Sequence, residues 1–240
     1  MGQLIDRVWV KGSVSTNDQK GNFKRASSVF RNKISSNHPT YLPETNRYHL
    51  YVSYACPWAH RTLIFRKLKK LASHISVDYV HPDMLEMGWS FEKTFPGVSG
   101  DSLHNKRYVH EIYQLSDKDI STKATVPILW DKKTRTIVNN ESSEIIRIMN
   151  DAFNDITKNK DDYYPEKFRD QIDSINDTIY ENINNGVYRS GFSKTQNSYE
   201  EAVKNLFTSL DMVNDILEGR DFLVGDILTE ADIRLVPTLI

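Results

Sequence analysis

The chain has 240 residues, of which 39% are hydrophobic and 26% charged, as in an ordinary globular protein with one large or two small domains. Its formal net charge of -1 indicates neither a nucleic-acid-binding surface nor an acidic tail. The N-terminus lacks a secretory pattern and no apolar run approaches the roughly 20 residues of a membrane span, so we expect a cytoplasmic protein without a membrane partner.

Residues 1–46 are polar and irregular, and we expect them to form an N-terminal extension that wraps the first domain. Residues 47–153 then alternate strand and helix patterns in the order β-α-β-(α)-β-β-α. We expect the strands at 48–53, 76–80, 126–130 and 136–138, and the helices at 57–71, 108–115 and 142–149.

Strand patterns stop at about Asp162, after a polar linker that covers residues 154–162. Beyond it, apolar residues recur with helical spacing in three segments: 168–183, 198–217 and Thr229 onward. The sequence therefore predicts an α/β domain, residues 47–153, followed by an all-α domain, residues 163–240.

Cys56 is the single cysteine, which excludes an internal disulfide and argues against a cysteine-based metal site. It follows a strand pattern and precedes Pro57, which suits the first turn of a helix. Backbone N–H groups and the positive end of the helix dipole stabilise a thiolate there and lower its pKa. The alternative is a structural, buried cysteine.

Position 59 would hold the second cysteine of a Cys-x-x-Cys oxidoreductase, but this chain has Ala59 there. Without a resolving thiol, a mixed disulfide on Cys56 has to be released by a thiol from outside the chain. Glutathione is the usual intracellular candidate, so the pattern favours one-thiol chemistry.

Thr125-Val126-Pro127 is the second feature of interest. A proline that opens a strand after a polar loop can be cis, and would turn the Val126 backbone outward to pair with an extended, peptide-like ligand. The alternative is an edge-strand proline without a ligand.

Asn140 to Glu144 precede an apolar helical face. Ser142 and the amides of the helix N-terminus can hold an α-carboxylate, and Glu141 can pair with the α-amino group of the same ligand. The γ-glutamyl end of glutathione offers both groups. A plain capped helix start explains the same residues, and both interpretations can be true together.

Gly88-Trp89 lies in a long loop, where the indole either covers the ligand's peptide or fills the domain surface. The seven histidines show no metal-ligand spacing, so we expect no metal site; His60 is interpreted as structural or solvent-facing. Arg66, Lys67, Lys69 and Lys70 are interpreted as a solvated helix face that could also attract anionic glutathione.

Nine motifs extend over nearly the whole chain: Phe23-Lys24-Arg25, Phe30-Arg31, Ile34-Ser35, Cys56 to Arg61, Gly88-Trp89, Val126 to Asp131, Ile137 to Ile146, Ile183 to Tyr188 and Leu228 to Leu235. Together they resemble the glutathionyl-hydroquinone reductases, the Xi class, which are related to omega-class glutathione transferases. The nearest likeness is to the fungal omega-like branch.

The resemblance implies a thioredoxin-like domain followed by a helical domain, and a homodimer. It implies that Cys56 attacks the sulfur of a glutathionyl-hydroquinone, and that glutathione, the co-substrate, then releases Cys56. Tyr188 would line the quinol side and donate a hydrogen bond to the leaving group. The glutathionyl part would be bound by Trp89, Val126, Glu141 and Ser142.

Members of that family are typically longer, so we expect the C-terminal domain to be incomplete and to expose Ile233, Leu235 and Val236. Two other functions remain open. One is a broader omega-type thiol transferase or dehydroascorbate reductase, which uses the same sulfur. The other is a non-catalytic module with a glutathione-transferase-like fold, since a fold alone does not decide function.

Overall fold

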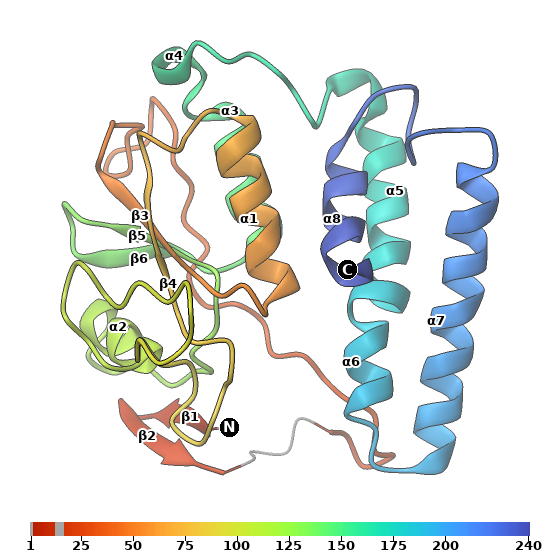
Figure 1. The fold of residues 1–240 in the computed structure, drawn as a ribbon, viewed down its shortest axis with the longest axis horizontal. Helices are drawn as coiled ribbons and strands as arrows, with labels where there is room; N and C mark the ends of the chain where they lie inside the picture. The colour runs from red at the N-terminus through yellow and green to blue at the C-terminus, as the bar shows by residue number, and fades with distance from the viewer. Residues whose placement is uncertain (1, 13–16) are drawn as a thin grey trace. The chain divides into compact units, whose positions relative to one another are not determined.

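The computed structural model describes residues 2–12 and 17–240 and contains two compact units (Figure 1). The first comprises Met1–Val14 and Ser27–Asp161, and the second Ser15–Ala26 and Asp162–Ile240. The expected N-terminal extension, residues 1–46, is therefore divided between the two units. Residues 1 and 13–16 of that extension lie outside the described residues.

The first unit is built on a four-stranded sheet in the order β4-β3-β5-β6. β3 and β4 are parallel, whereas β5 is antiparallel to both of its neighbours, β3 and β6. Helices α1 and α3 pack on one face of the sheet and α2 on the other (Figure 1). All residues of the central strands β3 and β5 are buried, as expected for strands covered on both faces.

This order of elements confirms the predicted thioredoxin-like α/β arrangement. The strands are β3 (Tyr48–Val52), β4 (Ser76–Tyr79), β5 (Ile128–Asp131) and β6 (Thr136–Asn139). The helices are α1 (Pro57–Leu68), α2 (Val109–Ser116), α3 (Ser142–Asp151) and, within the predicted linker, the short α4 (Asn154–Thr157).

We expected the first residues to be irregular, but they form an antiparallel hairpin of β1 (Gly2–Ile5) and β2 (Val8–Lys11). Its two turn residues, Asp6 and Arg7, have φ angles of 45° and 66°, the left-handed pair of a type I′ turn. The sequence did not reveal the hairpin because Asp-Arg lacks the glycine that usually marks such a turn.

The hairpin is held on the first unit by an aromatic contact. The Trp9 ring stacks on His110 of α2, with 4.3 Å between ring centroids. The Trp9 indole N–H also donates to the carbonyl of Glu86 at 3.1 Å. A stacked pair and a satisfied indole N–H together fix the hairpin on the loop that precedes α2.

A second part of the extension covers the edge of the sheet. Arg31 forms an antiparallel bridge with Asn139, and the Asn32 N–H donates to the Val138 carbonyl at 3.0 Å. Since β6 is an edge strand, this segment pairs backbone groups that the edge would otherwise present to solvent.

Residues 17–26 pack in the second unit, so the expectation that the whole extension wraps the first domain is wrong for this segment. The Lys20 carbonyl accepts a hydrogen bond from the Ser198 hydroxyl at 2.8 Å, and the Gly21 carbonyl accepts one from the Lys194 N–H at 3.2 Å. These bonds attach the segment to the start of α7 (Gln196–Leu217).

The second unit is helical, as predicted. Its elements are η1 (Glu166–Phe168), α5 (Arg169–Ile179), the π-helical η2 (Tyr180–Asn184), α6 (Gly186–Gly191), α7 and α8 (Glu230–Leu239). They enclose an apolar core of Ile172, Ile179, Ile183, Leu206, Val213, Leu223, Val224, Ala231 and Leu235. No helix in the described residues is long and apolar enough to cross a membrane.

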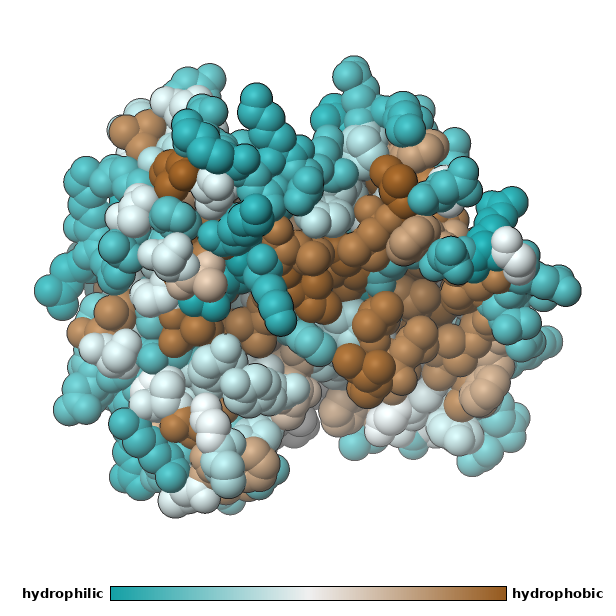
Figure 2. All heavy atoms as spheres, turned by 45° about the horizontal axis from the view of Figure 1, so that its top comes forward, coloured by the Kyte–Doolittle hydropathy of each residue, from teal (hydrophilic) through white to brown (hydrophobic). Residues whose placement is uncertain are grey.

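Helix α8 begins at the predicted Thr229–Asp232 signal. The Asp232 carboxylate accepts from the Thr229 N–H at 2.8 Å, and the Thr229 hydroxyl accepts from the Ala231 N–H, which is a capping box. The expected exposure is wrong for Ile233 and Leu235, which are both 3% exposed, because α8 turns this face into the protein. Val236 is 44% exposed, as expected. Figure 2 shows that the face it draws carries a broad apolar area bordered by polar residues.

The basic cluster on α1 is only partly solvated. Lys69 is 1% exposed, and its ammonium donates to the carbonyls of Asn159 and Asp161. Arg66 donates to the Ile75 carbonyl at 2.7 Å. The interpretation of a solvated face is therefore wrong for these two residues. Carbonyls of the chain that follows α1 accept from Arg66, and carbonyls of the chain that follows α4 accept from Lys69.

Candidate functional site

Cys56 is the N-cap residue of α1, at the turn between β3 and that helix, where the sequence placed it. Pro57 occupies the first helical position, and the Cys56 carbonyl accepts from the His60 N–H at 3.0 Å. The residue is 7% exposed, and its Sγ lies 3.5 Å from the Val126 carbonyl oxygen. The side chain makes no capping hydrogen bond, but the positive end of the helix dipole at this point favours a thiolate.

The Val126-Pro127 peptide bond is cis, as predicted. Tyr113 of α2 holds the residue that precedes it: the Tyr113 hydroxyl donates to the Thr125 carbonyl at 3.0 Å. The same hydroxyl accepts from the Asn140 amide at 3.0 Å. Burial raises the pKa of Tyr113 and keeps its phenol neutral, so the hydroxyl can serve both roles.

Tyr113 therefore joins two segments that the sequence named separately, the turn before β5 and the residues before α3. No sequence pattern pointed to a role for Tyr113. Its place in the predicted helix 108–115 was visible, but the direction of its side chain was not.

Glu141 is the N-cap residue of α3 and occupies the position predicted for it. Its carboxylate accepts from the Ser143 N–H at 3.2 Å and from the Ser143 hydroxyl at 2.9 Å. The hydroxyl of Ser28, in the N-terminal extension, donates to the other oxygen at 3.0 Å. The capping interpretation is thus observed, and binding of an amino group remains a prediction.

Ser142, the first residue of α3, is 3% exposed and faces α1. The guanidinium of Arg61 approaches the Ser142 hydroxyl at 3.5 Å, and its carbon lies 4.6 Å from the centroid of the Trp58 ring. Arg61 is 2% exposed, so the structure places a buried positive charge beside the helix N-terminus at which we predicted carboxylate binding. The sequence showed Arg61 only as part of the motif after Cys56.

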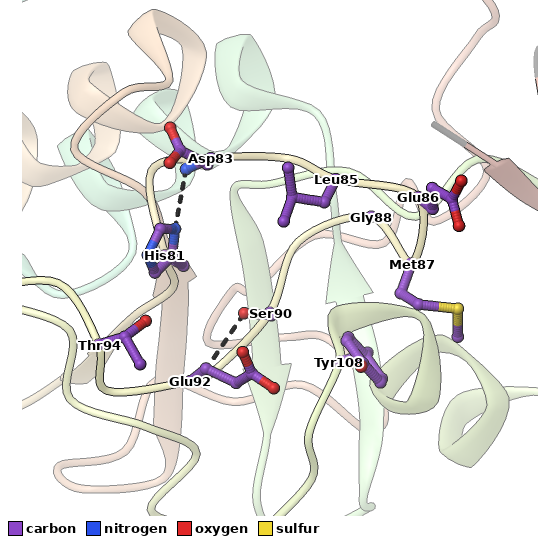
Figure 3. Close-up of a pocket in the computed structure, with 10 residues that line it drawn as sticks. All are labelled: His81, Asp83, Leu85, Glu86, Met87, Gly88, Ser90, Glu92, Thr94 and Tyr108. Atoms are coloured by element: carbon purple, nitrogen blue, oxygen red, sulfur yellow. Dashed lines mark hydrogen bonds between the residues drawn. The ribbon is translucent and has the colours of Figure 1, made fainter.

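Trp89 is half-buried in the loop between β4 and α2, and its carbonyl accepts from the Val109 N–H at 3.0 Å. Its neighbours Gly88 and Ser90 line a cavity of about 330 Å³, which Figure 3 shows. The other lining residues are His81, Asp83, Leu85, Glu86, Met87, Glu92, Thr94 and Tyr108. Trp89 is thus held by contacts different from those that bring Cys56 and Val126 together.

Tyr188, the predicted quinol-side residue, belongs to the second unit and lies on α6. The guanidinium carbon of Arg25 is 4.5 Å from the centroid of the Tyr188 ring, and Arg25 Nε donates to the Asn185 side chain at 2.6 Å. Phe23 stacks on Tyr188, with 6.2 Å between centroids. The N-terminal segment that resembles the family thus packs against this tyrosine.

Within residues 2–12 and 17–240, no group of three His, Cys, Asp or Glu side chains is placed to hold a metal ion. Two helix N-termini of the first unit carry the candidate residues: Cys56 at α1, beside the Val126 carbonyl, and Glu141 with Ser142 at α3, where Arg61 of α1 approaches Ser142. In chemical terms, it can offer a nucleophilic sulfur, a backbone edge and groups for a zwitterionic amino acid end.

Comparison with known proteins gives a consistent result. Residues 55–152 match the family described as glutathione S-transferase, N-terminal domain, and residues 196–240 match glutathione S-transferase, C-terminal domain. The chain is 49% identical over 247 residues to glutathionyl-hydroquinone reductase YqjG of Escherichia coli, covering 100% of this chain and 75% of that protein. It is 50% identical over 242 residues to glutathionyl-hydroquinone reductase PcpF of Sphingobium chlorophenolicum, with the same coverage.

Solved structures of similar proteins lead to the same family assignment. The glutathione-S-transferase Xi from Phanerochaete chrysosporium has a TM-score of 0.91 and 52% identity, covering 93% of this chain and 72% of that one. The glutathione-bound structure of YqjG from Escherichia coli has a TM-score of 0.89 and 46% identity, covering 99% and 74%. The resemblance predicted from the motifs is confirmed: the chain belongs to the glutathione transferase family, in the Xi class that contains the glutathionyl-hydroquinone reductases.

Proposed function

We propose that the protein is a glutathione-dependent thiol transferase that reduces glutathionyl-hydroquinones through a mixed disulfide on Cys56. The observation that supports this most directly is the position of the only thiol, at the N-cap of α1 with Sγ 3.5 Å from the Val126 carbonyl. Two relatives that are 49% and 50% identical over their alignments are named as glutathionyl-hydroquinone reductases.

In the first step, the Cys56 thiolate attacks the sulfur of the glutathionyl-hydroquinone. An S–S bond forms between Cys56 and the glutathionyl sulfur, and the bond from that sulfur to the aromatic carbon breaks. The carbon retains the electron pair and takes up one proton, which gives the hydroquinone. The helix N-terminus favours this step because it stabilises the thiolate.

In the second step, the thiolate of glutathione attacks the glutathionyl sulfur of the mixed disulfide. Cys56 leaves as a thiolate, and glutathione disulfide is the product. The net reaction converts one conjugate and one glutathione into one hydroquinone and one glutathione disulfide. Ala59 supports this route, because the chain has no second cysteine that could release Cys56.

The binding roles follow the same proposal. The backbone at Val126 pairs with the peptide of glutathione, while Glu141 and Ser142 receive its γ-glutamyl end. Trp89 covers the peptide. Tyr188 donates a hydrogen bond to an oxygen of the hydroquinone. In this division, residues 47–153 bind glutathione and residues 163–240 contribute to the quinol side.

The test is an assay of a glutathionyl-hydroquinone with glutathione, comparing the parent protein with Cys56→Ser. We expect turnover to fall by at least about 10³-fold, because a weak hydroxyl nucleophile replaces the thiolate. Mass spectrometry of the parent with conjugate alone should show one added glutathionyl group, absent from the variant. Turnover retained in Cys56→Ser would contradict the mechanism.

A broader omega-type activity is the second candidate, because a relative with 47% identity, from Schizosaccharomyces pombe, is named glutathione S-transferase omega-like 2. Dehydroascorbate and a small mixed disulfide distinguish the two activities when they are assayed beside the quinol conjugate. A non-catalytic module would bind glutathione but turn over none of these substrates.

We further propose that the protein works in the cytoplasm as a homodimer. A thiol that is released from its mixed disulfide by glutathione requires a reducing compartment in which glutathione is abundant. Light scattering on the purified full chain would give the mass of the assembly, and a monomer at micromolar concentration would refute the dimer.

A further inference from the structure

Residues 28–31 of the N-terminal extension are fixed beside the start of α3 by hydrogen bonds of the backbone and of side chains. The Asn140 N–H donates to the Phe30 carbonyl at 3.1 Å, and the Phe30 N–H donates to the Asn140 side-chain oxygen at 3.0 Å. One residue further, Arg31 makes an ion pair with Glu144 at 2.5 Å. Residues 30 and 31 thus have little freedom relative to the N-terminus of α3.

Ser28 lies two residues before Phe30 and faces the same helix start. Its Oγ is 3.0 Å from Oε2 of Glu141 and 3.3 Å from the Asn140 carbonyl oxygen. A hydroxyl has one proton to donate, and a carboxylate is the stronger acceptor of the two. The nearer distance also favours Glu141 as the acceptor.

The two oxygens of the Glu141 carboxylate are therefore held from opposite sides. Ser143 donates twice to Oε1, through its N–H and its hydroxyl, and Ser28 donates to Oε2. Together these donors restrict rotation of the carboxylate plane. A carboxylate has about four acceptor positions, so capacity remains on Oε2 for a further donor such as an ammonium group.

We propose that Ser28 is a positioning residue that orients the Glu141 carboxylate toward the α-amino group of glutathione. The inference rests on the proposed function, in which Glu141 receives that amino group. A carboxylate ordered before binding loses less side-chain entropy when the ligand arrives. The extension would then contribute to affinity for glutathione without a direct contact to it.

The test measures the binding of two peptides to the Cys56→Ser protein with and without the additional substitution Ser28→Ala. The Cys56→Ser background prevents a mixed disulfide with Cys56. One peptide is glutathione, and the other is glutaryl-cysteinylglycine, which has the same chain but no α-amino group. Calorimetry gives both affinities. We expect Ser28→Ala to weaken glutathione binding about fivefold and to leave binding of the glutaryl peptide unchanged.

Two further variants complete the design. Ser28→Thr retains the hydroxyl and should restore most of the affinity for glutathione, whereas Ser27→Ala, at an exposed neighbouring serine, should change neither affinity. Circular dichroism on each variant verifies the fold. If Ser28→Ala weakened the binding of both peptides equally, or did not weaken the binding of glutathione, the positioning role would be overturned.

The failure of the proposed function would look different. If the Cys56→Ser protein with an intact Ser28 bound neither peptide, glutathione would not be its ligand, and the inference would fall with it. If it bound both peptides equally well, Glu141 would not receive the amino group, which contradicts the inference but leaves the chemistry of Cys56 intact.

Discussion

The Tyr113 hydroxyl accepts a hydrogen bond from the Asn140 amide at 3.0 Å and so connects α2 to the residue that precedes Glu141. Because the same hydroxyl donates to the Thr125 carbonyl, one buried phenol supports both segments expected to bind glutathione. The candidate site therefore depends on a side chain that takes no part in the proposed chemistry.

Replacing Tyr113 by Phe should lower the free energy of unfolding by about 1–3 kcal/mol, because two buried polar groups lose their partner. Urea denaturation measures the change. Tyr199→Phe is the matched control: this tyrosine is 47% exposed on α7, and its loss should change stability by less than about 0.5 kcal/mol. Equal effects of the two variants would contradict the bridging role.

Replacing Tyr188 by Phe should separate the two half-reactions. We expect release of hydroquinone to slow about tenfold, since the leaving group loses a hydrogen-bond donor. Release of Cys56 by glutathione should be unaffected, because that step involves no quinol oxygen. Single-turnover kinetics with conjugate, and with pre-glutathionylated protein, measure the steps individually. Equal losses in both steps would refute the assigned role.

Asp131 should make stability depend on pH. Its side chain is fully buried and pairs with Arg47 at 2.6 Å. Burial raises the pKa of Asp131, but hydrogen bonds from Arg47, the Lys133 N–H and Thr134 outweigh this, and the pKa is lowered overall. A lowered carboxyl pKa stabilises the fold above the unfolded value of about 3.9 and ceases to do so as pH falls through the folded value.

We therefore expect Asp131→Asn to destabilise the protein by about 1–3 kcal/mol at pH 7, since it removes the buried carboxylate and leaves the Arg47 charge paired with Glu44 alone. The difference from the parent should shrink as pH falls below about 4, because the unfolded parent then takes up a proton that the folded carboxylate, with its lowered pKa, binds only at lower pH. Thermal unfolding across pH 3–7 measures this, with Asp177→Asn on the exposed face of α5 as control. A difference that stays constant with pH would argue against the ion pair.

Lys69 provides a test of the end of α1. Because its buried ammonium donates to the Asn159 and Asp161 carbonyls, Lys69→Met should cost about 1–3 kcal/mol of unfolding free energy. Lys67→Met, on the exposed side of the same helix, should be nearly neutral. If both substitutions were neutral in chemical denaturation, the buried bonds would contribute nothing to stability.

Much of the fold could be predicted from short-range patterns. Apolar spacing gave the strands and helices of the first unit and the helical second unit, and Cys56-Pro57 and Thr229–Asp232 marked two helix starts that the structure confirms. These signals are local, because a cap or a helical face depends on residues within one or two turns. The N-terminal hairpin was missed because its Asp6-Arg7 turn lacks the usual glycine.

The residue order is enough to show that these 240 residues hold one thiol and no second one to resolve it, and to show which residues open α1 and α3. The partners that surround those residues follow only from the folded arrangement. Ser28 and Glu141 are 113 positions apart, and Arg47 and Asp131 are 84 apart, yet both pairs are hydrogen-bonded. No local pattern encodes such partners, because they meet only when burial of the apolar faces brings distant segments together.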